Sequence, residues 1–339
     1  MKKYLQFGFV TLATIALSVG ISSCSEQGNT PKSSSVEELN SDLPAADGNV
    51  TYPIELNTAW GSSTLKERPK KIAAVSVTGY DAELLVALDV SPITAASTIK
   101  SNGASWTTDA DSMGEVRSYF DYTFGDPLPY EDIAAVEPDL IVMLGPMPSM
   151  DPQSDFNGLE KIAPVLAATN EPTIKQGWKE DIKQIARVLD IESLADAVTE
   201  EYDSRIGKLR NTLNADGKTV SLLGSYESGL KFVSKEGSLS LGLLQELGFR
   251  ESPGTVRFSE DSSVPNELLP LVNADVILIS DIRGDNGESI KSNPLFSQVA
   301  ENVKFIHIDG GGSLPWALDS GGPLGQMWAA QKLADAIDA

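Results

Sequence analysis

The feature that most constrains this fold is a repeated alternation of strand and helix patterns on both sides of a helical middle. In the first half, a strand pattern at residues 71–77 is followed by a helix pattern at 81–88 with acidic residues in its first turn. A second helix pattern at 130–136 leads through a Pro-Asp turn into a wholly apolar strand at 140–144. Apolar strands separated by helices indicate a parallel sheet covered by helices.

The middle of the chain is helical. A pattern at residues 178–189 breaks at Asp190-Ile191, and a second pattern continues from 192 to 213. At 1.5 Å per residue, the about 22 residues of the second helix span about 33 Å, which is the width of a small domain. Such a helix can bridge two lobes, although the pattern alone fits an ordinary surface helix equally well.

The alternation resumes after residue 217. Strand patterns lie at 219–223, 232–234, 275–280 and 304–308, and helix patterns at 240–247, 267–272 and 325–337. We therefore predict an α/β fold with two lobes, each containing a mostly parallel sheet flanked by helices. The expected domains are an N-terminal lobe over 51–175, a helical segment with the interlobe helix over 176–214, and a C-terminal lobe over 215–339.

The first 50 residues have a different composition. A basic start, an apolar run at residues 7–19 and small residues before Cys24 predict a lipoprotein signal peptide over 1–23, because the run is shorter than the ~20 residues of a membrane span. Cys24 is then the expected lipid attachment site, with a secretory signal and an incidental cysteine as the alternative. Residues 24–50, rich in Ser, Asn, Pro, Gly and acid, predict a flexible tether.

Composition limits the chemistry that this chain can perform. It carries 26 basic and 48 acidic residues, so nucleic acid and anionic lipid surfaces are not expected partners of the body. One cysteine excludes internal disulfides, and the only histidine, His307, lies in an apparent strand. No His/Cys cluster suited to zinc and no nucleophile elbow occurs in the sequence. We expect no enzyme activity, no cofactor and no protein metal ligands, although a hydrolase that uses only carboxylates stays open.

Aromatic and arginine residues in loops are the candidate ligand contacts. Flat aromatic faces and forked guanidinium donors suit a rigid, oxygen-rich, partly apolar ligand held between lobes. The candidates are Tyr80, Trp106, Arg117, Tyr119 and Tyr122 in the first half, and Tyr226, Arg257, Arg283 and Trp316 in the second. Aromatic residues at loop bases also fill cores, so each candidate alone is weak.

Several segments together resemble a known family. They are 68–73, 81–88, 130–142, 159–165, 178–181, 267–269 and 274–279, of which 130–142, with its glutamate-bearing helix, Pro-Asp turn and apolar strand, is the most specific. They are similar to the lipid-anchored ferric-siderophore-binding proteins of ABC importers, the class III binding proteins whose two lobes are joined by one long rigid helix. The resemblance covers about residues 51–339. Asp89 and Asp190 stand where the family usually has glycine.

The resemblance implies a function and partners. A monomeric, lipid-anchored protein on the extracytoplasmic face of the cell membrane would capture an iron(III)-siderophore between its lobes and deliver it to an ABC permease driven by an ATPase. Glu131 and Glu267, one from each lobe, would dock onto permease arginines; the alternative is that they are solvated first-turn acids favoured by the helix dipole. The siderophore would coordinate the iron, and the bridging helix implies only modest closure on binding.

Two further alternatives and one choice of ligand stay open. A cobalamin- or haem-binding protein of the same class is the first alternative, with Tyr80, Tyr119 or Tyr226 as possible tyrosinate ligands of haem. A lipid-anchored hydrolase is the second. An anionic catecholate siderophore would need a local basic patch from Arg117, Arg250, Arg257 or Arg283, whereas the overall excess of acid suits a neutral or cationic hydroxamate.

Overall fold

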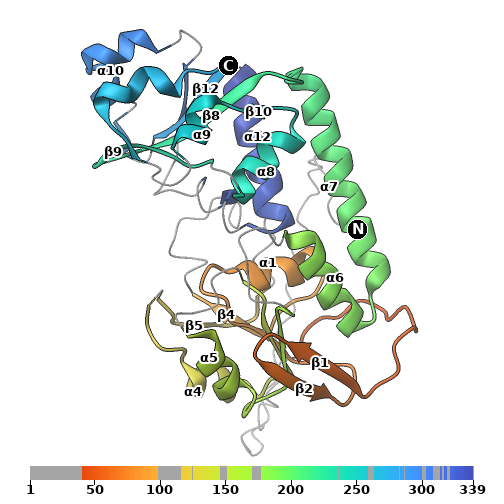
Figure 1. Cartoon of the computed structure of the whole chain (residues 1–339). Helices are drawn as coiled ribbons and strands as arrows, with labels where there is room; N and C mark the ends of the chain where they lie inside the picture. Colours follow the sequence, from red (N-terminus) through yellow and green to blue (C-terminus); the bar gives the residue numbers. More distant parts are fainter. Residues whose placement is uncertain are drawn as a thin grey trace, which may run out of the picture. The chain divides into compact units, whose positions relative to one another are not determined.

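The computed structural model describes residues 40–97, 116–123, 125–145, 151–169, 177–234, 237–258, 263–281, 283–285, 287–299, 303–307, 314, 317–318 and 321–338. Cys24, Trp106, Trp316 and the expected signal peptide lie outside these ranges. The described residues belong to one compact unit, Leu39–Ala339, which contains two large sheets flanked by helices and a smaller two-stranded sheet (Figure 1). No helix in the described ranges combines the length and apolar character of a membrane span.

The sheet of the N-terminal lobe (N-lobe) has five strands, all parallel, in the order β5-β4-β3-β6-β7. The strands are β3 (Ile72–Ala74), β4 (Thr94–Ala96), β5 (Tyr119–Phe120), β6 (Leu140–Met143) and β7 (Val165–Ala167). The helices of this lobe are α1 (Tyr80–Ala87), α4 (Tyr130–Ala135) and α5 (Pro152–Leu159). Every residue of β3, β4, β6 and β7 is buried, which confirms the prediction of a covered parallel sheet.

An antiparallel hairpin of β1 (Ile54–Thr58) and β2 (Gly61–Leu65) accompanies this sheet. The hairpin contacts β7 and α5: a Cβ atom at Gly61, where φ is +156°, would lie 2.6 Å from Cε1 of Phe156. Glycine is therefore needed at this point for the hairpin to pack closely on α5.

The sheet of the C-terminal lobe (C-lobe) is mixed. Its path is β11-β9-β8-β12-β13, and β10 also pairs with β8. The strands are β8 (Thr219–Tyr226), β9 (Gly229–Phe232), β10 (Arg250–Glu251), β11 (Ser263–Val264), β12 (Val276–Asp281) and β13 (Val303–His307). Strand β8 is parallel to β10 and β12, so the sheet is mostly parallel, as predicted. The antiparallel edge formed by β9 and β11 was not predicted.

Helices and 3-10 helices surround the C-lobe sheet. They are α8 (Leu239–Glu246), α9 (Pro253–Arg257), η3 (Asn266–Val272), α10 (Glu288–Lys291), η4 (Pro294–Gln298) and α12 (Pro323–Asp338). The helix that we expected at 267–272 is η3, a 3-10 helix with Pro270 inside it. Proline lacks the backbone N–H that an α-helix interior needs, so the tighter helix is the physical outcome of this sequence.

The two sheets share one structural device at their amino edges. In the N-lobe, the Asp139 carboxylate, just before β6, accepts the backbone N–H groups of Lys70 and Lys71, just before β3. In the C-lobe, Asp275, just before β12, accepts the N–H and hydroxyl of Thr219 at the start of β8. Each aspartate thus fixes the register of two parallel neighbours, which gives the Pro-Asp-strand motif a structural role.

Helices α6 (Trp178–Leu189) and α7 (Glu192–Leu213) form the helical middle with the predicted break between them. Helix α7 packs on α6 at one end and on α8 and α12 of the C-lobe along its length (Figure 1). The rings of Trp178 and Tyr202 meet edge to face with centroids 4.8 Å apart. One apolar cluster runs from α1 through α6 and α7 to α12, so the two lobes share a core along this helix.

Residues 41–50, which we expected to belong to a flexible tether, are instead bonded to the body. The Asp190 carboxylate accepts the backbone N–H groups of Gly48, Asn49 and Val50 at 2.9, 2.9 and 3.2 Å. Asp47, within this segment, accepts hydrogen bonds from the backbone N–H and the hydroxyl of Ser193 at the start of α7. The segment is held by backbone and side-chain hydrogen bonds, which composition does not reveal.

Asp190 combines this role with a left-handed backbone, φ 58°, and Asp89 ends α1 in the same conformation, φ 62°. These are the positions where the resembling family has glycine, and aspartate is among the few other residues that tolerate this region. Both helices therefore end as they would with glycine. At Asp190, the side chain adds the contacts that hold residues 48–50.

We expect Asp190→Ala to lower the free energy of unfolding by about 2 to 3 kcal/mol more than Asp89→Ala does. Both substitutions place alanine in a left-handed conformation, so their difference isolates the three hydrogen bonds of the Asp190 carboxylate. Urea denaturation followed by circular dichroism measures both values. Equal losses in the two variants would show that residues 48–50 do not depend on Asp190.

Candidate ligand-binding site

Two predicted ligand residues meet at the carboxyl edge of the C-lobe sheet. Tyr226 ends β8 and Arg283 lies two residues after β12, and both line two adjoining hollows of about 430 and 570 Å³. Ligands of open α/β sheets bind outside the carboxyl ends of the strands, and small-molecule pockets have volumes in this range. This edge, with both hollows, is hereafter the C-lobe pocket.

Half of the other lining residues of the C-lobe pocket are polar. The polar ones include Glu227 and Ser228 of the β8–β9 turn, Asn266 of η3, Ser289 of α10 and Asn293 just before η4. Hydroxyl and amide groups can donate to or accept from the oxygen atoms of a ligand. The pocket therefore offers an aromatic face, one guanidinium and several neutral hydrogen-bonding groups.

Positively and negatively charged side chains lie close together around the C-lobe pocket. Arg283 Nε lies 3.4 Å from Asp285 Oδ2, and the Lys231 amino group lies 5.5 Å from the ring centroid of Tyr226. Glu227 lines both hollows. Hydrogen bonds from Ser289 hold the pKa of Asp285 below its usual value, so this carboxylate stays ionised at neutral pH.

A buried aspartate fixes the turn that carries Arg283. Asp281 is 2% exposed, and its Oδ1 accepts the Ser225 hydroxyl at 3.1 Å and the Gly284 N–H at 3.2 Å. The first contact joins the ends of β8 and β12, and the second closes the turn around Arg283. Tyr226 and Arg283 are thereby presented from one rigid edge.

The N-lobe tyrosines are more enclosed. Tyr122, just after β5, is 5% exposed and its ring lies 6.5 Å from that of Phe120, while Tyr119 within β5 is half-buried. Burial raises the pKa of both hydroxyls. Arg117 precedes β5 and pairs with Asp42, so it lies toward the amino edge of the sheet, whereas Tyr122 follows the strand.

Tyr80 lies in the interior at the start of α1. It is 3% exposed, and its hydroxyl donates to Asp181 Oδ2 at 2.7 Å. Burial, followed by the Asp181 carboxylate, raises the pKa of Tyr80 well above its ordinary value. Tyr80 thus ties α1 to α6.

The adjacent Asp81 joins the ends of two N-lobe strands. Its two oxygens accept the backbone N–H groups of Ser76 and Leu144, which follow β3 and β6. Burial raises the pKa of Asp81 to about 7, against the opposing effect of these N–H groups. The carboxyl edge of the N-lobe sheet is therefore built around this side chain.

The remaining predicted residues lie on the surface. Arg257 ends α9, is exposed, and its guanidinium lies 5.8 Å from the ring centroid of Phe258. Glu131 is exposed in the first turn of α4, and Glu267 is exposed in the first turn of η3. The neighbours of Glu267, Pro265 and Asn266, line the C-lobe pocket.

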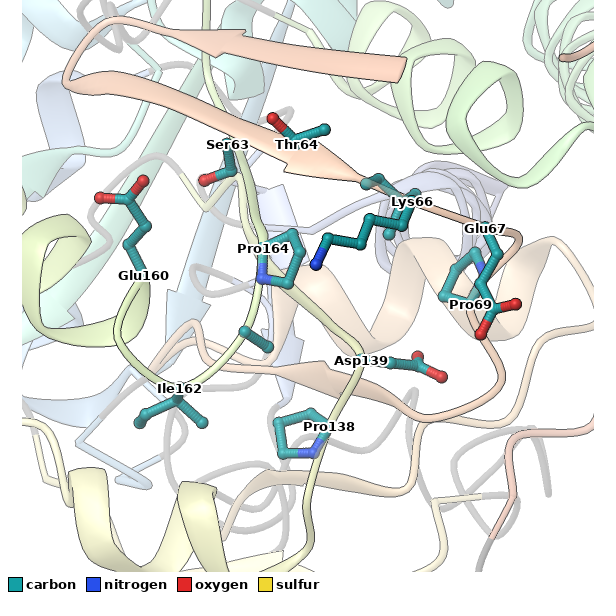
Figure 2. Close-up of a pocket in the computed structure, with 12 residues that line it drawn as sticks. Ser63, Thr64, Lys66, Glu67, Pro69, Pro138, Asp139, Glu160, Ile162 and Pro164 are labelled. Atoms are coloured by element: carbon teal, nitrogen blue, oxygen red, sulfur yellow. The ribbon is translucent and has the colours of Figure 1, made fainter. Parts of the chain in front are cut away.

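A further pocket of about 450 Å³ lies at the opposite edge of the N-lobe sheet. Pro69, Pro138 and Pro164, which line it, precede β3, β6 and β7. Figure 2 shows the Lys66 side chain reaching from the end of the hairpin toward Pro164. Because this is the amino edge of parallel strands, we do not assign the pocket to the ligand.

Four residues at the C-lobe pocket were not predicted from the sequence: Glu227, Lys231, Asn266 and Asp285. Glu227 and Asp285 each lie within two residues of a predicted contact, Tyr226 or Arg283. Since a turn presents consecutive side chains around one opening, proximity in sequence to Tyr226 and Arg283 was the available signal.

Two α/β lobes connected through a long helix, with a pocket at a carboxyl strand edge, define a two-lobe solute-binding architecture. Residues 74–309 match the family model described as periplasmic binding protein. The chain belongs to this family of periplasmic binding proteins, whose members bind solutes. Among curated proteins, none matches the chain in sequence.

Solved structures with the same fold include three informative ones. A periplasmic solute-binding protein of Mycobacterium smegmatis has a TM-score of 0.65 at 19% identity, covering 84% of this chain and 98% of that one. PiaA of Streptococcus pneumoniae in complex with ferrichrome has a TM-score of 0.63 at 22% identity, covering 84% of this chain and 97% of that one. The catecholate-siderophore-binding protein VctP of Vibrio cholerae has a TM-score of 0.57 at 17% identity, covering 85% of this chain and 99% of that one.

Proposed function

We propose that this protein is a membrane-anchored solute-binding protein that captures an iron(III)-siderophore and delivers it to an ABC permease driven by an ATPase. The observation that carries the proposal is the C-lobe pocket, where Tyr226 and Arg283 lie at the carboxyl edge of a sheet in a periplasmic-binding-protein fold. The relatives named for ferrichrome and for catecholate siderophores support an iron complex as the solute.

The chemistry of the pocket fits a ligand that brings its own metal shell. Within the described residues, no group of three or more His, Cys, Asp and Glu side chains is placed to hold a metal ion. A siderophore occupies the coordination sites of iron(III) with its own oxygens, so the protein needs only to hold the organic shell. The Tyr226 ring, the Arg283 guanidinium and the amide of Asn266 are suited to that task.

Two of the three tyrosines considered as haem ligands, Tyr80 and Tyr119, are poorly suited to that role. A tyrosinate ligand must lose its proton, but the Tyr80 hydroxyl is buried, donates to Asp181 and has a pKa well above its ordinary value. Burial also raises the pKa of Tyr119. The family match to solute-binding proteins likewise argues against the carboxylate-based hydrolase and against enzyme activity.

Membrane attachment and permease docking complete the proposal. Cys24 carries the lipid that holds the protein at the extracytoplasmic face, on the evidence of the apolar run and small residues before it. The protein acts as a monomer. Glu131 and Glu267 contact the permease, supported by their exposure in the first turns of α4 and η3.

The test is a titration of the mature, detergent-solubilised protein, followed by tryptophan fluorescence. The titrants are iron-loaded hydroxamate and catecholate siderophores, with haem, cobalamin and the iron-free siderophores as controls. Submicromolar affinity for one iron complex is the expected result. A fluorescence response to haem or cobalamin alone would mean that this compound, and not an iron-siderophore, is the ligand. No response to any titrant would reject the proposal that the protein captures a ligand of these classes.

A further inference from the structure

The charges at the C-lobe pocket restrict the class of siderophore, an inference that rests on the proposed function. We infer that the ligand is an iron(III) complex without net negative charge, of the trihydroxamate kind, and that Glu227 and Asp285 disfavour tris-catecholate complexes. A ferric tris-catecholate carries three negative charges, whereas a ferric trihydroxamate can be neutral. The electrostatic field of the charged side chains at the pocket therefore discriminates between neutral and triply negative iron complexes.

The pocket holds no uncompensated positive charge among its described lining residues. Its guanidinium, Arg283, pairs with Asp285, and Glu227 contributes a second carboxylate to the lining. Lys231 places a further cation beside the pocket, with its amino group over the Tyr226 ring. The lining residues thus carry two carboxylates against one cation, and the buried Asp281 carboxylate accepts the Gly284 N–H in the turn that carries Arg283.

The other arginines that would make a basic patch are not among the lining residues of the C-lobe pocket. Arg117 pairs with Asp42 near the amino edge of the N-lobe sheet. Arg250, in β10, donates to the carbonyl of Gly217 just before β8, at the amino edge of the C-lobe sheet. Arg257 ends α9, with its guanidinium 5.8 Å from the ring centroid of Phe258. None of these three arginines joins Arg283 in the lining of the pocket.

The sequence outside the described ranges adds little positive charge. Between residues 98 and 320 those segments carry Lys100, Lys175 and Lys235 as their basic residues and a larger number of carboxylates. The whole chain has a net charge of −22. The charge of the pocket lining and the net charge of the whole chain therefore both disfavour the binding of a trianion.

The experiment compares ferrichrome, a neutral ferric trihydroxamate, with ferric enterobactin, a tris-catecholate trianion, on the full mature protein. We expect ferrichrome to bind at least 100-fold more tightly at low salt. The ratio should narrow at least 10-fold in Glu227→Lys, because that variant replaces a repulsive charge with an attractive one at the pocket. Glu200→Lys makes the same charge change on the exposed face of α7 and should leave the ratio unchanged.

The outcomes separate this inference from the proposed function. Equal or tighter binding of ferric enterobactin would overturn the inference while leaving siderophore capture intact. An equal effect of the Glu227 and Glu200 variants would overturn the assignment to the pocket, because the selection would then be a property of the whole charge. If neither iron complex binds, the proposed function and the inference both fail.

Discussion

Replacing Glu83 with alanine is expected to lower the free energy of unfolding by about 3 kcal/mol, because it removes a buried, charge-assisted hydrogen bond between the lobes. Glu83 lies in α1 of the N-lobe and is 3% exposed. Its Oε1 accepts the backbone N–H of Gly325 at 2.7 Å, across 242 residues of sequence. Gly325 is the third residue of α12, which packs on the C-lobe sheet.

The surroundings of Glu83 explain why the effect should be large. The first N–H groups of a helix lack partners within it, and a carboxylate there also meets the positive end of the helix dipole. The fit is tight: a Cβ atom at Gly322 would lie 3.0 Å from Glu83 Oε1. Alanine at position 83 would leave the Gly325 N–H buried without this acceptor.

Two variants make the Glu83 measurement specific. Glu83→Gln retains an acceptor oxygen but not the charge, so a loss of about 1 kcal/mol is expected. Glu200→Ala removes an exposed glutamate on α7 and should change stability by less than about 0.5 kcal/mol. Urea denaturation of the three variants gives the comparison. If Glu83→Ala unfolds at the wild-type midpoint, the contact does not stabilise the fold.

The double substitution Glu131→Ala/Glu267→Ala is expected to reduce transport at least 10-fold and to change ligand affinity less than 2-fold. Removing one member of a close charge pair at an interface costs about 2 to 5 kcal/mol, which corresponds to at least a 10-fold weakening. Both glutamates are exposed on separate lobes. We therefore expect the double substitution to weaken binding of the protein to the permease and to leave binding of the iron complex nearly unchanged.

Transport is measured as uptake of labelled iron complex into vesicles that contain the permease and its ATPase, with the protein added outside. Glu200→Ala/Glu201→Ala removes the same charge from the exposed side of α7 and serves as the matched control. Each single variant should show an intermediate loss. Full uptake with the double variant would refute docking through these two carboxylates.

Long, uniformly apolar or strongly periodic segments could be predicted from the sequence. The helices expected at 178–189 and 192–213 are α6 and α7, and the strand expected at 140–144 is β6, one residue shorter. These segments bury side chains of regular spacing, so local pattern and tertiary packing agree. The parallel order of the N-lobe strands followed from the same alternation.

Elements held by contacts with distant residues could not be predicted. The β1–β2 hairpin has only three buried residues, Leu56, Ser63 and Leu65, which is too weak a pattern to recognise. Residues 41–50 lack an apolar pattern of their own, and the last four of them, 47–50, are fixed by Asp190 and Ser193, more than 100 positions away. Such order depends on backbone hydrogen bonds that composition does not encode.

The candidate site was predictable only in part for a similar reason. Tyr226 and Arg283 follow strand ends, and the rule that ligands bind at carboxyl edges places them together. Tyr80 also follows a strand, yet its ring is buried and its hydroxyl donates to Asp181. A loop aromatic can turn toward either the opening or the core, and only the packed structure decides which.

The aspartates at the amino edges of the two sheets have a consequence for how such proteins diversify. Asp139 and Asp275 set strand register at the edge away from the C-lobe pocket and the carboxyl-edge loops. Mutation of those loops can then change ligand preference without shifting any strand. Solved structures at 16 to 22% identity to this chain share its fold while their names record different cargoes, which is the outcome that such a separation permits.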